Sequence, residues 1–435
     1  MPHVLRSSLD ALRSSLDAPR SSLDAPRSSP HALRLSLFAP RPHNKPYMSK
    51  HTQTIVLLLA LTLLFTASVW KIMSKDEMPN LYTHQAYAFL HGRLNIDERL
   101  YDTALFDGKF YVPFPPFPAL LLVPFVAAFG VYGFKVTPIA IFLSLFNALV
   151  MLQVLKKLNA QRHAIWLCAA FFLGTAYWSM VRGSAGVWFF AHVVAVGCML
   201  LAINEALGPS RGWLVGLLVG LAFLTRQLSI FHAVFLTAVL WQQPKRWFNL
   251  AGFAVALGMC LGVYLLFNYQ RFGNMFDTGY SYLTPYGILK QRLDRFGLFN
   301  AAYVPFNFVY LFLQGFHIEY GGTGRLFAAS PDPFGTSITF ASPFIFAALW
   351  AKWGKLRGSA AWVSIGLILL YLLFYYNNGS AQWNAQRFTL DFMPLLMVLV
   401  ARGMAQADER LLTFWKGTIV YAVALNALTL FVLVP

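Results

Sequence analysis

The sequence is poor in charged residues and in cysteine. Charged residues make up 12% of its 435 positions, about half of the roughly 25% that is usual in soluble globular domains. This deficit excludes an ordinary water-soluble enzyme, an intrinsically disordered chain and a coiled coil. The three cysteines, Cys168, Cys198 and Cys260, each lie inside an apolar run, and they are too few for a disulfide framework or a zinc site.

Nucleotide-binding motifs are also missing. The sequence contains no Walker A pattern and no glycine-rich loop between a strand and a helix, which are the usual phosphate-binding motifs of soluble nucleotide enzymes. A substrate that arrives through the lipid is therefore favoured over a soluble nucleotide.

Apolar residues are abundant and the net charge is strongly positive. The chain is 57% hydrophobic and 16% aromatic, with a mean hydropathy of +0.55 and a formal charge of +17. This composition is typical of a membrane protein. A basic excess suggests nucleic acid or another anionic partner, unless the position of the charges gives it a different meaning.

The first 47 residues are a heptapeptide repeat. From Leu5 the chain reads LRSSLDA twice, then PRSSLDA, PRSSPHA and LRLSLFA, and the prolines at positions 19, 26 and 30 interrupt any helix. A targeting peptide is one interpretation, although three aspartates argue against an acid-poor transit segment. We favour a disordered leader translated upstream of a true start at Met48, with residues 48–435 as one membrane domain.

The remaining chain contains eleven apolar runs that we interpret as membrane-spanning helices. A twelfth run, residues 117–133, contains two prolines and is assigned to a juxtamembrane or re-entrant hairpin. The expected fold is all-α and polytopic. The eleven runs are residues 53–72, 137–155, 163–181, 186–206, 212–226, 228–242, 248–268, 338–351, 359–376, 386–402 and 412–434.

The basic clusters set the expected orientation. Short loops rich in Lys and Arg face the cytoplasm, and the hairpin assignment places the clusters at 156–162, 245–246 and 352–357 on that side. The outer loops are then residues 73–136, hairpin included, and 269–337. Segments 73–116 and 269–337 hold ten of the fourteen acidic residues that follow Met48. The positive charge is thus mainly a topology signal, and nucleic acid is not expected as a partner.

An acidic pair follows the first span on the outer face. Asp76 and Glu77 precede a predicted amphipathic helix that ends near His91. A carboxylate there has the chemistry of a general base or of a ligand to a divalent cation. A solvated helix start, favoured by the helix dipole, is the alternative interpretation.

Five cations are candidates for binding a phosphate on the same face. Arg226 lies between two short apolar runs with no loop to solvate it, and a charge at that depth is a functional hypothesis by default. Arginine matches phosphate geometry through paired N–H groups. Singly, each of these residues also fits a snorkelling interfacial side chain. The five are Arg226, Arg182, Arg271, Arg387 and Lys109.

Three further residues are candidates for contact with a substrate. His192 lies near the outer end of its predicted span, Trp383 belongs to the outer aromatic residues and His84 lies on the predicted amphipathic helix. A packed, hydrogen-bonded histidine and an aromatic belt at the membrane surface are the structural alternatives.

Several segments together resemble the integral-membrane glycosyltransferases of the GT-C superfamily, near the protein mannosyltransferase and aminoarabinose transferase families. The resemblance covers most of residues 53–435 and rests on the order of the motifs. It is carried by Asp76–Glu77 and by DGKFYVPFPPFPALLLVPF, GTAYWSMVRGSAGVWFFAH, GLLVGLAFLTRQ, NYQRFGNMFDTGY, FGTSITFASPF and QWNAQRFTLDFMPLL.

The resemblance implies an inverting transfer of a sugar from a polyprenyl-phosphate donor. The acceptor would be a glycan, a lipid or a protein, and the cavity would open on the non-cytoplasmic face of the cell (inner) membrane. Asp76 matches the family's acidic residue in the first outer loop, its base or metal-binding carboxylate, with Glu77 beside it. Arg226 matches the basic residue that faces the donor phosphate. A divalent cation held by Asp76 and Glu77 is the one cofactor to consider.

The sequence departs from the family pattern at two positions. Phe114 stands where aminoarabinose-transferase-like members have a lysine, and the acid that often follows Arg182 is missing from GSAGVWFFAH. These differences leave the sugar and any metal requirement open. Two other functions also stay open, a transporter or flippase of an anionic lipid-linked substrate and a non-catalytic scaffold.

Overall fold

The computed structural model describes residues 80–433 except 284, 286, 327, 379–381 and 383, together with Leu63, Ala67 and Trp70. The repeat at 1–47 and the acidic pair at 76–77 lie outside the described residues. So does the predicted first span at 53–72, apart from three positions that are helical.

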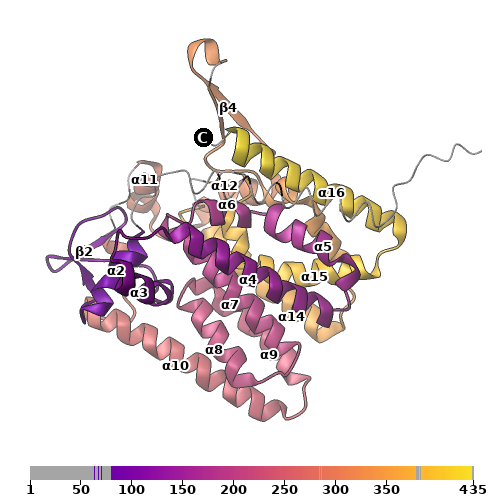
Figure 1. Ribbon diagram of the computed structural model, residues 1–435, viewed down its shortest axis with the longest axis horizontal. Helices are drawn as coiled ribbons and strands as arrows, with labels where there is room; N and C mark the ends of the chain where they lie inside the picture. The colour runs from indigo at the N-terminus through magenta and orange to yellow at the C-terminus, as the bar shows by residue number, and fades with distance from the viewer. Residues whose placement is uncertain are drawn as a thin grey trace, which may run out of the picture. The chain divides into compact units, whose positions relative to one another are not determined.

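The described chain is mostly helical (Figure 1). Its α-helices are α2 (Leu81–Leu90), α3 (Phe117–Phe129), α4 (Val136–Lys157), α5 (Ala164–Cys168), α6 (Tyr177–Arg182), α7 (Val187–Ala206), α8 (Gly212–Phe223), α9 (His232–Trp241), α10 (Arg246–Phe272), α11 (Gly287–Phe296), α12 (Val304–Phe308), α13 (Ile338–Ala341), α14 (Lys355–Phe374), α15 (Met393–Gln406) and α16 (Glu409–Leu428).

Short 3-10 and π segments extend or join these helices. The 3-10 segments are η1 (Gln161–His163), η3 (Gln227–Phe231), η4 (Tyr280–Tyr282), η5 (Ala301–Tyr303), η7 (Thr323–Arg325), η8 (Pro343–Trp350) and η9 (Arg387–Asp391). The π segments are η2 (Ala169–Leu173), η6 (Val309–Leu313) and η10 (Thr429–Leu433).

Five helices in the described part are long and apolar enough to cross a membrane: α4, α7, α10, α14 and the α16–η10 helix. Five other apolar helices have 10–17 residues, and at 1.5 Å per residue each is shorter than a 30 Å hydrocarbon core. The helices support a multi-pass membrane protein, while the count of eleven spans stays a prediction. Helix α3, in the predicted hairpin, has 13 residues and contains Pro124.

The long helices present apolar faces outward. On α4, Phe142 and Leu149 are 70% and 61% exposed, and on α10 Met259 is 68% exposed. Soluble monomers rarely expose apolar faces of this extent, whereas lipid covers them at no cost. Helix α7 is the exception, because 83% of its most apolar window is buried, so it forms the centre of the bundle.

Two small antiparallel sheets depart from the all-α prediction. Strands β1 (Asn95–Ile96), β2 (Ala104–Phe106) and β3 (Lys109–Tyr111) pair in the order β1-β3-β2, and β4 (Ile318–Gly321) pairs with β5 (Ala328–Pro331). The Asp107-Gly108 turn joins β2 to β3 with both φ angles positive, as tight hairpins require. That Asp-Gly pair is a sequence signal for the hairpin that hydropathy alone does not show.

The three basic clusters lie at one end of the bundle. Lys157 donates from Nζ to the Asn204 carbonyl, and Arg162 donates to the Ala405 carbonyl. Arg402 and Gln406 both donate to the Lys352 carbonyl. The start of α10 joins the same end, because Gly212 packs against the Asn249 backbone and Arg211 pairs with Glu205. We call this the basic end.

The long segments 80–116 and 273–337 meet at the opposite end, which we call the loop end. Here the Phe117 amide donates to the Leu224 carbonyl, and Arg271 donates to the Val112 carbonyl. Asn300 donates its amide to the Phe374 carbonyl, and Thr336 donates to Asn384. The separation of the two ends follows the arrangement expected from the charges.

Helices α8 and α10 pack unusually closely because of glycine. A Cβ at Gly212, Gly216 or Gly220 would lie 1.7 Å from the Asn249 carbonyl oxygen, 2.2 Å from the Phe253 carbonyl oxygen and 2.4 Å from the Cys260 Sγ atom, respectively. Small residues every four positions allow such backbone contact between membrane helices. The contact fixes where α8 ends, and therefore where Arg226 lies.

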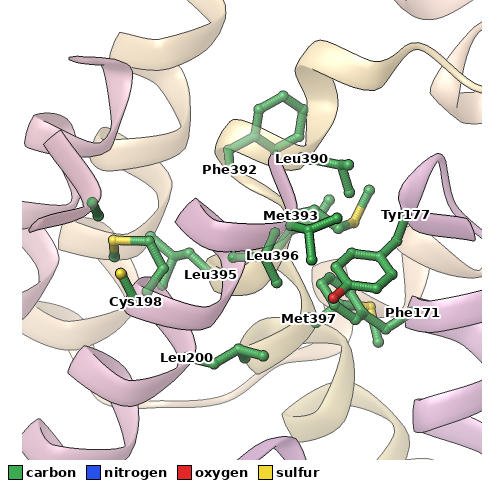
Figure 2. Packing of buried hydrophobic residues seen from close by; sticks show 14 of the residues in the cluster. Phe171, Tyr177, Cys198, Leu200, Leu390, Phe392, Met393, Leu395, Leu396 and Met397 are labelled. Atoms are coloured by element: carbon green, nitrogen blue, oxygen red, sulfur yellow. The ribbon is translucent and has the colours of Figure 1, made fainter. Parts of the chain in front are cut away.

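Helix α15 packs on α7 through the core. Figure 2 shows Met393, Leu395, Leu396 and Met397 of α15 together with Cys198 and Leu200 of α7, and all six side chains are at most 7% exposed. Phe392, 2% exposed, precedes this contact directly. The core thus holds the start of α15, which follows η9 directly, against the C-terminal half of α7. Cys168, Cys198 and Cys260 are free.

Candidate functional site

Two helix breaks at the loop end present charged side chains to each other. Helix α8 ends at Phe223 and η3 begins at Gln227, so Arg226 has an extended backbone between them. Segment η9 ends at Asp391, and Pro394 in the first turn of α15 prevents a regular helix from continuing toward the N-terminus. One break follows α8 and the other precedes α15, so the two are far apart in the sequence.

Arg226 and Asp391 form a two-pronged ion pair. Arg226 Nε lies 2.5 Å from Asp391 Oδ1, and Nη2 lies 2.7 Å from Oδ2. The Asp391 side chain is 1% exposed and the Arg226 side chain 17% exposed. The carboxylate is therefore enclosed and aligns the guanidinium, while part of the Arg226 side chain stays accessible.

His192 completes this group from α7. Its Nδ1 atom is 3.8 Å from Asp391 Oδ1, and its side chain is 1% exposed. That distance is too long for a hydrogen bond, and the buried Nε2 atom has no hydrogen-bond partner. The Nε2 atom of this imidazole can therefore donate or accept a further hydrogen bond beside the ion pair.

Arg387 adds a second guanidinium to the group. It lies over the rings of Phe189 and Phe388, 5.1 and 5.4 Å from their centroids, and it interacts electrostatically with Arg226 and Asp391. Two guanidiniums thus lie near the enclosed Asp391 carboxylate, and Arg387 also interacts with Asp102. We call Arg226, Arg387, Asp391 and His192 the arginine cluster.

Asp102 borders the cluster from the first outer loop. It hydrogen-bonds the Trp188 side chain at the start of α7 and interacts electrostatically with Arg387. Burial raises the pKa of the Asp102 carboxyl above its usual value, and both neighbours oppose that rise. The loop therefore supplies a partly buried carboxyl group near the point where α7 begins.

Three tyrosines lie near Arg226. Tyr82 at the start of α2, Tyr280 in η4 and Tyr371 near the end of α14 all interact electrostatically with Arg226. The Gln227 side chain, next along the chain, donates to the Tyr264 hydroxyl at 2.9 Å. Several loop-end elements thus bring tyrosine side chains close to Arg226 and its neighbour.

Other predicted phosphate ligands lie outside the cluster. Arg271 is 2% exposed, donates to the Val112 carbonyl and the Asn268 side chain, and lies over the Phe267 ring at 3.9 Å. Its bonds tie α10 to the first outer loop. Arg182 donates to the Leu430 carbonyl near the C-terminus. Lys109 lies on the exposed hairpin beside its turn.

His84 also lies apart from the cluster, on α2. Its Nδ1 atom is 3.7 Å from Glu98 Oε1, and its ring meets Tyr132 edge-on at 5.6 Å. Burial lowers the pKa of His84, and Glu98 opposes that shift. Its described contacts are those of a packing residue that joins α2 to Glu98 and Tyr132.

Three predicted site residues, Asp76, Glu77 and Trp383, lie outside the described residues. Among the residues that the structure describes, no group of three or more His, Cys, Asp or Glu side chains is placed to hold a metal ion. A cation site at Asp76 and Glu77 stays a prediction.

Asp391 and Asp102 were not selected from the sequence. Asp391 stands at the start of an apolar run, in TLDFMPLL, and the reasoning that singled out Arg226, a charge next to an apolar run, applies equally to it. Asp102 carries no such signal, because it is one of several acids in a polar loop.

Comparisons with known proteins identify two similar crystal structures. Both are of ArnT from Cupriavidus metallidurans, one bound to undecaprenyl phosphate and one in the apo state. Sequence identity is 13% and 14%, the aligned region covers 84% and 85% of this chain, and the TM-scores are 0.48 and 0.49. This chain spans 62% of the length of those chains. No protein-family model and no curated protein matches the sequence.

Proposed function

We propose that the protein is a membrane glycosyltransferase of the GT-C type that takes a sugar from a polyprenyl-phosphate donor. The observation that carries the proposal is the arginine cluster, because it places two guanidiniums beside one enclosed carboxylate between apolar helices. An anionic group attached to a lipid chain is the ligand that this combination suits. The order of sequence motifs that resembles the superfamily supports the same assignment.

The cluster suits the phosphate of the donor. Asp391 engages Nε and one side of Nη2 of Arg226, which leaves further N–H groups of the guanidinium for a phosphate oxygen. Charge-assisted bonds to arginine are strong and geometrically selective. Arg387 adds positive charge as the leaving phosphate develops its own negative charge during the transfer.

We assign the base to Asp76, with Glu77 beside it. Asn80 anchors the chain that follows this pair, since its side chain donates to the Ser184 carbonyl at 2.9 Å and also accepts the amide of Tyr82. Asp76 lies four positions before this anchor, a length that spans at most about 14 Å. This short connection to Asn80 supports Asp76 as the base for the site beside Tyr82 and Arg226.

In the proposed reaction the acceptor is a hydroxyl or amine of a glycan, lipid or protein. Asp76 removes its proton, the acceptor atom attacks the anomeric carbon, and the bond from that carbon to the phosphate oxygen breaks. Attack opposite the leaving phosphate inverts the anomeric configuration. The polyprenyl phosphate leaves with the bonding electrons and is held by Arg226.

The proposed orientation puts the loop end on the non-cytoplasmic face of the cell (inner) membrane. The basic end gathers the Lys and Arg clusters, and such clusters remain cytoplasmic in membrane proteins. Labelling of single cysteines introduced at Lys109 and at Lys245 with a membrane-impermeant maleimide tests the orientation in a cysteine-free background. Labelling at position 109 alone in intact cells is the expected result.

Reconstitution with a panel of polyprenyl-phosphate sugars tests the function. The expected result is loss of sugar from one donor, with release of polyprenyl phosphate and a mass increase of the acceptor in mass spectrometry. A transporter or flippase, the alternative function, would move the donor across the vesicle membrane and leave its sugar–phosphate bond intact.

A further inference from the structure

A small cavity borders Phe388, the ring over which the Arg226 and Arg387 guanidiniums lie. It is lined by Phe388, Leu311, Leu372 and four polar side chains, and it has room for about one water molecule, ≈ 10 Å³. The four polar residues are Asn307, Tyr310, Asn378 and Gln386. They come from the α12–η6 helix, from the segment after α14 and from the segment before η9.

Two of these side chains have unsatisfied polar atoms. Asn378 is 6% exposed, and among the described residues neither the amide nitrogen nor the carbonyl oxygen of its side chain has a hydrogen-bond partner. Asn307 is 1% exposed, and its side-chain carbonyl oxygen is also unpartnered. Buried polar groups are normally paired, so orphaned atoms beside a cavity indicate a missing ligand or water.

The remaining polar groups of the cavity are held in place. The Asn307 amide nitrogen donates to the carbonyl oxygens of Leu372, Leu373 and Tyr375 at 2.9–3.0 Å, which fixes the orientation of its free carbonyl oxygen. The Tyr310 hydroxyl donates to Asp332 at 3.1 Å. Gln386 donates to the Phe334 carbonyl. Asn307 and Asn378, with their unpartnered atoms, therefore line the cavity beside side chains that are held by hydrogen bonds.

We propose that this cavity receives one neutral hydroxyl-bearing group of the donor sugar. Asn378 offers both a donor and an acceptor, and Asn307 offers an acceptor, which is the pattern that a hydroxyl group satisfies. The described lining carries no charged side chain. The size admits a hydroxyl or hydroxymethyl group and excludes a whole ring.

The donor is favoured over the acceptor because of Phe388. The Arg226 guanidinium carbon lies 5.3 Å from the centroid of this ring, and that of Arg387 lies 5.4 Å from it, while the same ring lines the cavity. The same residue thus borders both the proposed phosphate site and the cavity. The sugar is the part of the donor that is bonded directly to the phosphate.

This inference rests on the proposed function, and a binding experiment separates the two. The full-length protein in detergent is titrated with undecaprenyl phosphate and with undecaprenyl-phosphate-linked mannose, arabinose and 4-amino-arabinose. The test variants are Asn378→Leu and Asn378→Ala, and Asn249→Leu at the basic end is the control. Thermal denaturation without ligand verifies folding, and both variants should match or exceed the wild-type Tm because no hydrogen bond is lost.

The expected result is a selective loss of sugar recognition. At least one sugar-bearing lipid should bind the wild type more tightly than undecaprenyl phosphate does. Asn378→Leu and Asn378→Ala should raise the Kd of that lipid about tenfold, as for the loss of one or two hydrogen bonds, and leave the Kd of undecaprenyl phosphate within twofold. Asn249→Leu should change neither value.

Two other results would overturn the assignments separately. If undecaprenyl phosphate binds but both Asn378 variants retain the wild-type preference for the sugar-bearing lipid, the cavity does not bind the donor sugar. If the wild type binds none of the lipids, the proposed function itself fails, whatever the variants do.

Discussion

The Arg226–Asp391 ion pair predicts a specific pattern of stability in three variants. Arg226→Met and Asp391→Leu each remove one partner, and the double variant removes both with apolar residues of similar volume. The structure encloses the Asp391 side chain almost completely and leaves the Arg226 side chain 17% exposed. Loss of the arginine should therefore cost more than loss of the aspartate, because the carboxylate that remains has less access to water.

The magnitude follows from the burial of the pair. Removing one partner of a buried ion pair costs about 3–5 kcal/mol, whereas replacing both with apolar side chains is often neutral. We place Asp391→Leu near 3 kcal/mol and Arg226→Met near 5 kcal/mol, the two ends of that approximate range. An unfolding entropy of about 2.1 cal/mol/K per residue converts these costs into Tm decreases of about 4–6 °C for a chain of this size. The double variant should melt within about 2 °C of the wild type.

Thermal denaturation of the purified variants in one detergent is the assay, with intrinsic tryptophan fluorescence as the readout. Each variant is measured at the same detergent and lipid concentration, because bound lipid changes the Tm. Additive losses in the double variant, or single variants that melt like the wild type, would refute the reasoning. Either result would mean that the pair is not energetically coupled.

Three further predictions concern other parts of the molecule. Gly216→Leu should prevent stable folding, because a Cβ at this position would lie 2.2 Å from the Phe253 carbonyl oxygen. The control Gly262→Ala should fold normally, because a Cβ there would have nothing within 4 Å. Fluorescence-detected size exclusion compares the two variants. Asp76→Asn should abolish sugar transfer in mass spectrometry and leave the Tm unchanged, and near-normal activity would show that Asp76 is not the base. Asp102→Asn should raise the Tm at pH 7. Burial raises the pKa of the Asp102 carboxyl in the folded state, so the stability that the protonated carboxyl contributes is lost as the pH rises through that pKa. The gain should shrink as the pH falls toward the ordinary pKa of 3.8, and a gain that is independent of pH would exclude this origin.

Hydropathy predicted most helix positions because a membrane helix needs a continuous apolar run. The predicted span 186–206 corresponds to α7, and 248–268 lies within α10. Run 163–181 is one predicted span but contains η2 and a break at Gly174 before α6. Hydropathy misses such a break, since π and irregular segments keep the apolar composition of a regular helix.

The site was predicted in part, for reasons of local sequence context. Arg226, Arg387 and His192 stood out as polar residues inside or beside apolar runs, and the fold brings these three together. Asp391 had the same context, but a search for phosphate-binding cations does not select an acid. The partners of Arg271 and Arg182 are backbone carbonyls, and a sequence carries no sign of which backbone group lies opposite a side chain.

Binding of undecaprenyl phosphate to the arginine cluster tests the central claim most directly. The comparison is between the wild type and the Arg226→Met/Asp391→Leu double variant, once its Tm has shown that it is folded. The loss of charge-assisted hydrogen bonds predicts an increase in Kd of about 10- to 150-fold, with little change for a neutral polyprenol. Equal binding of undecaprenyl phosphate by both proteins would contradict the account.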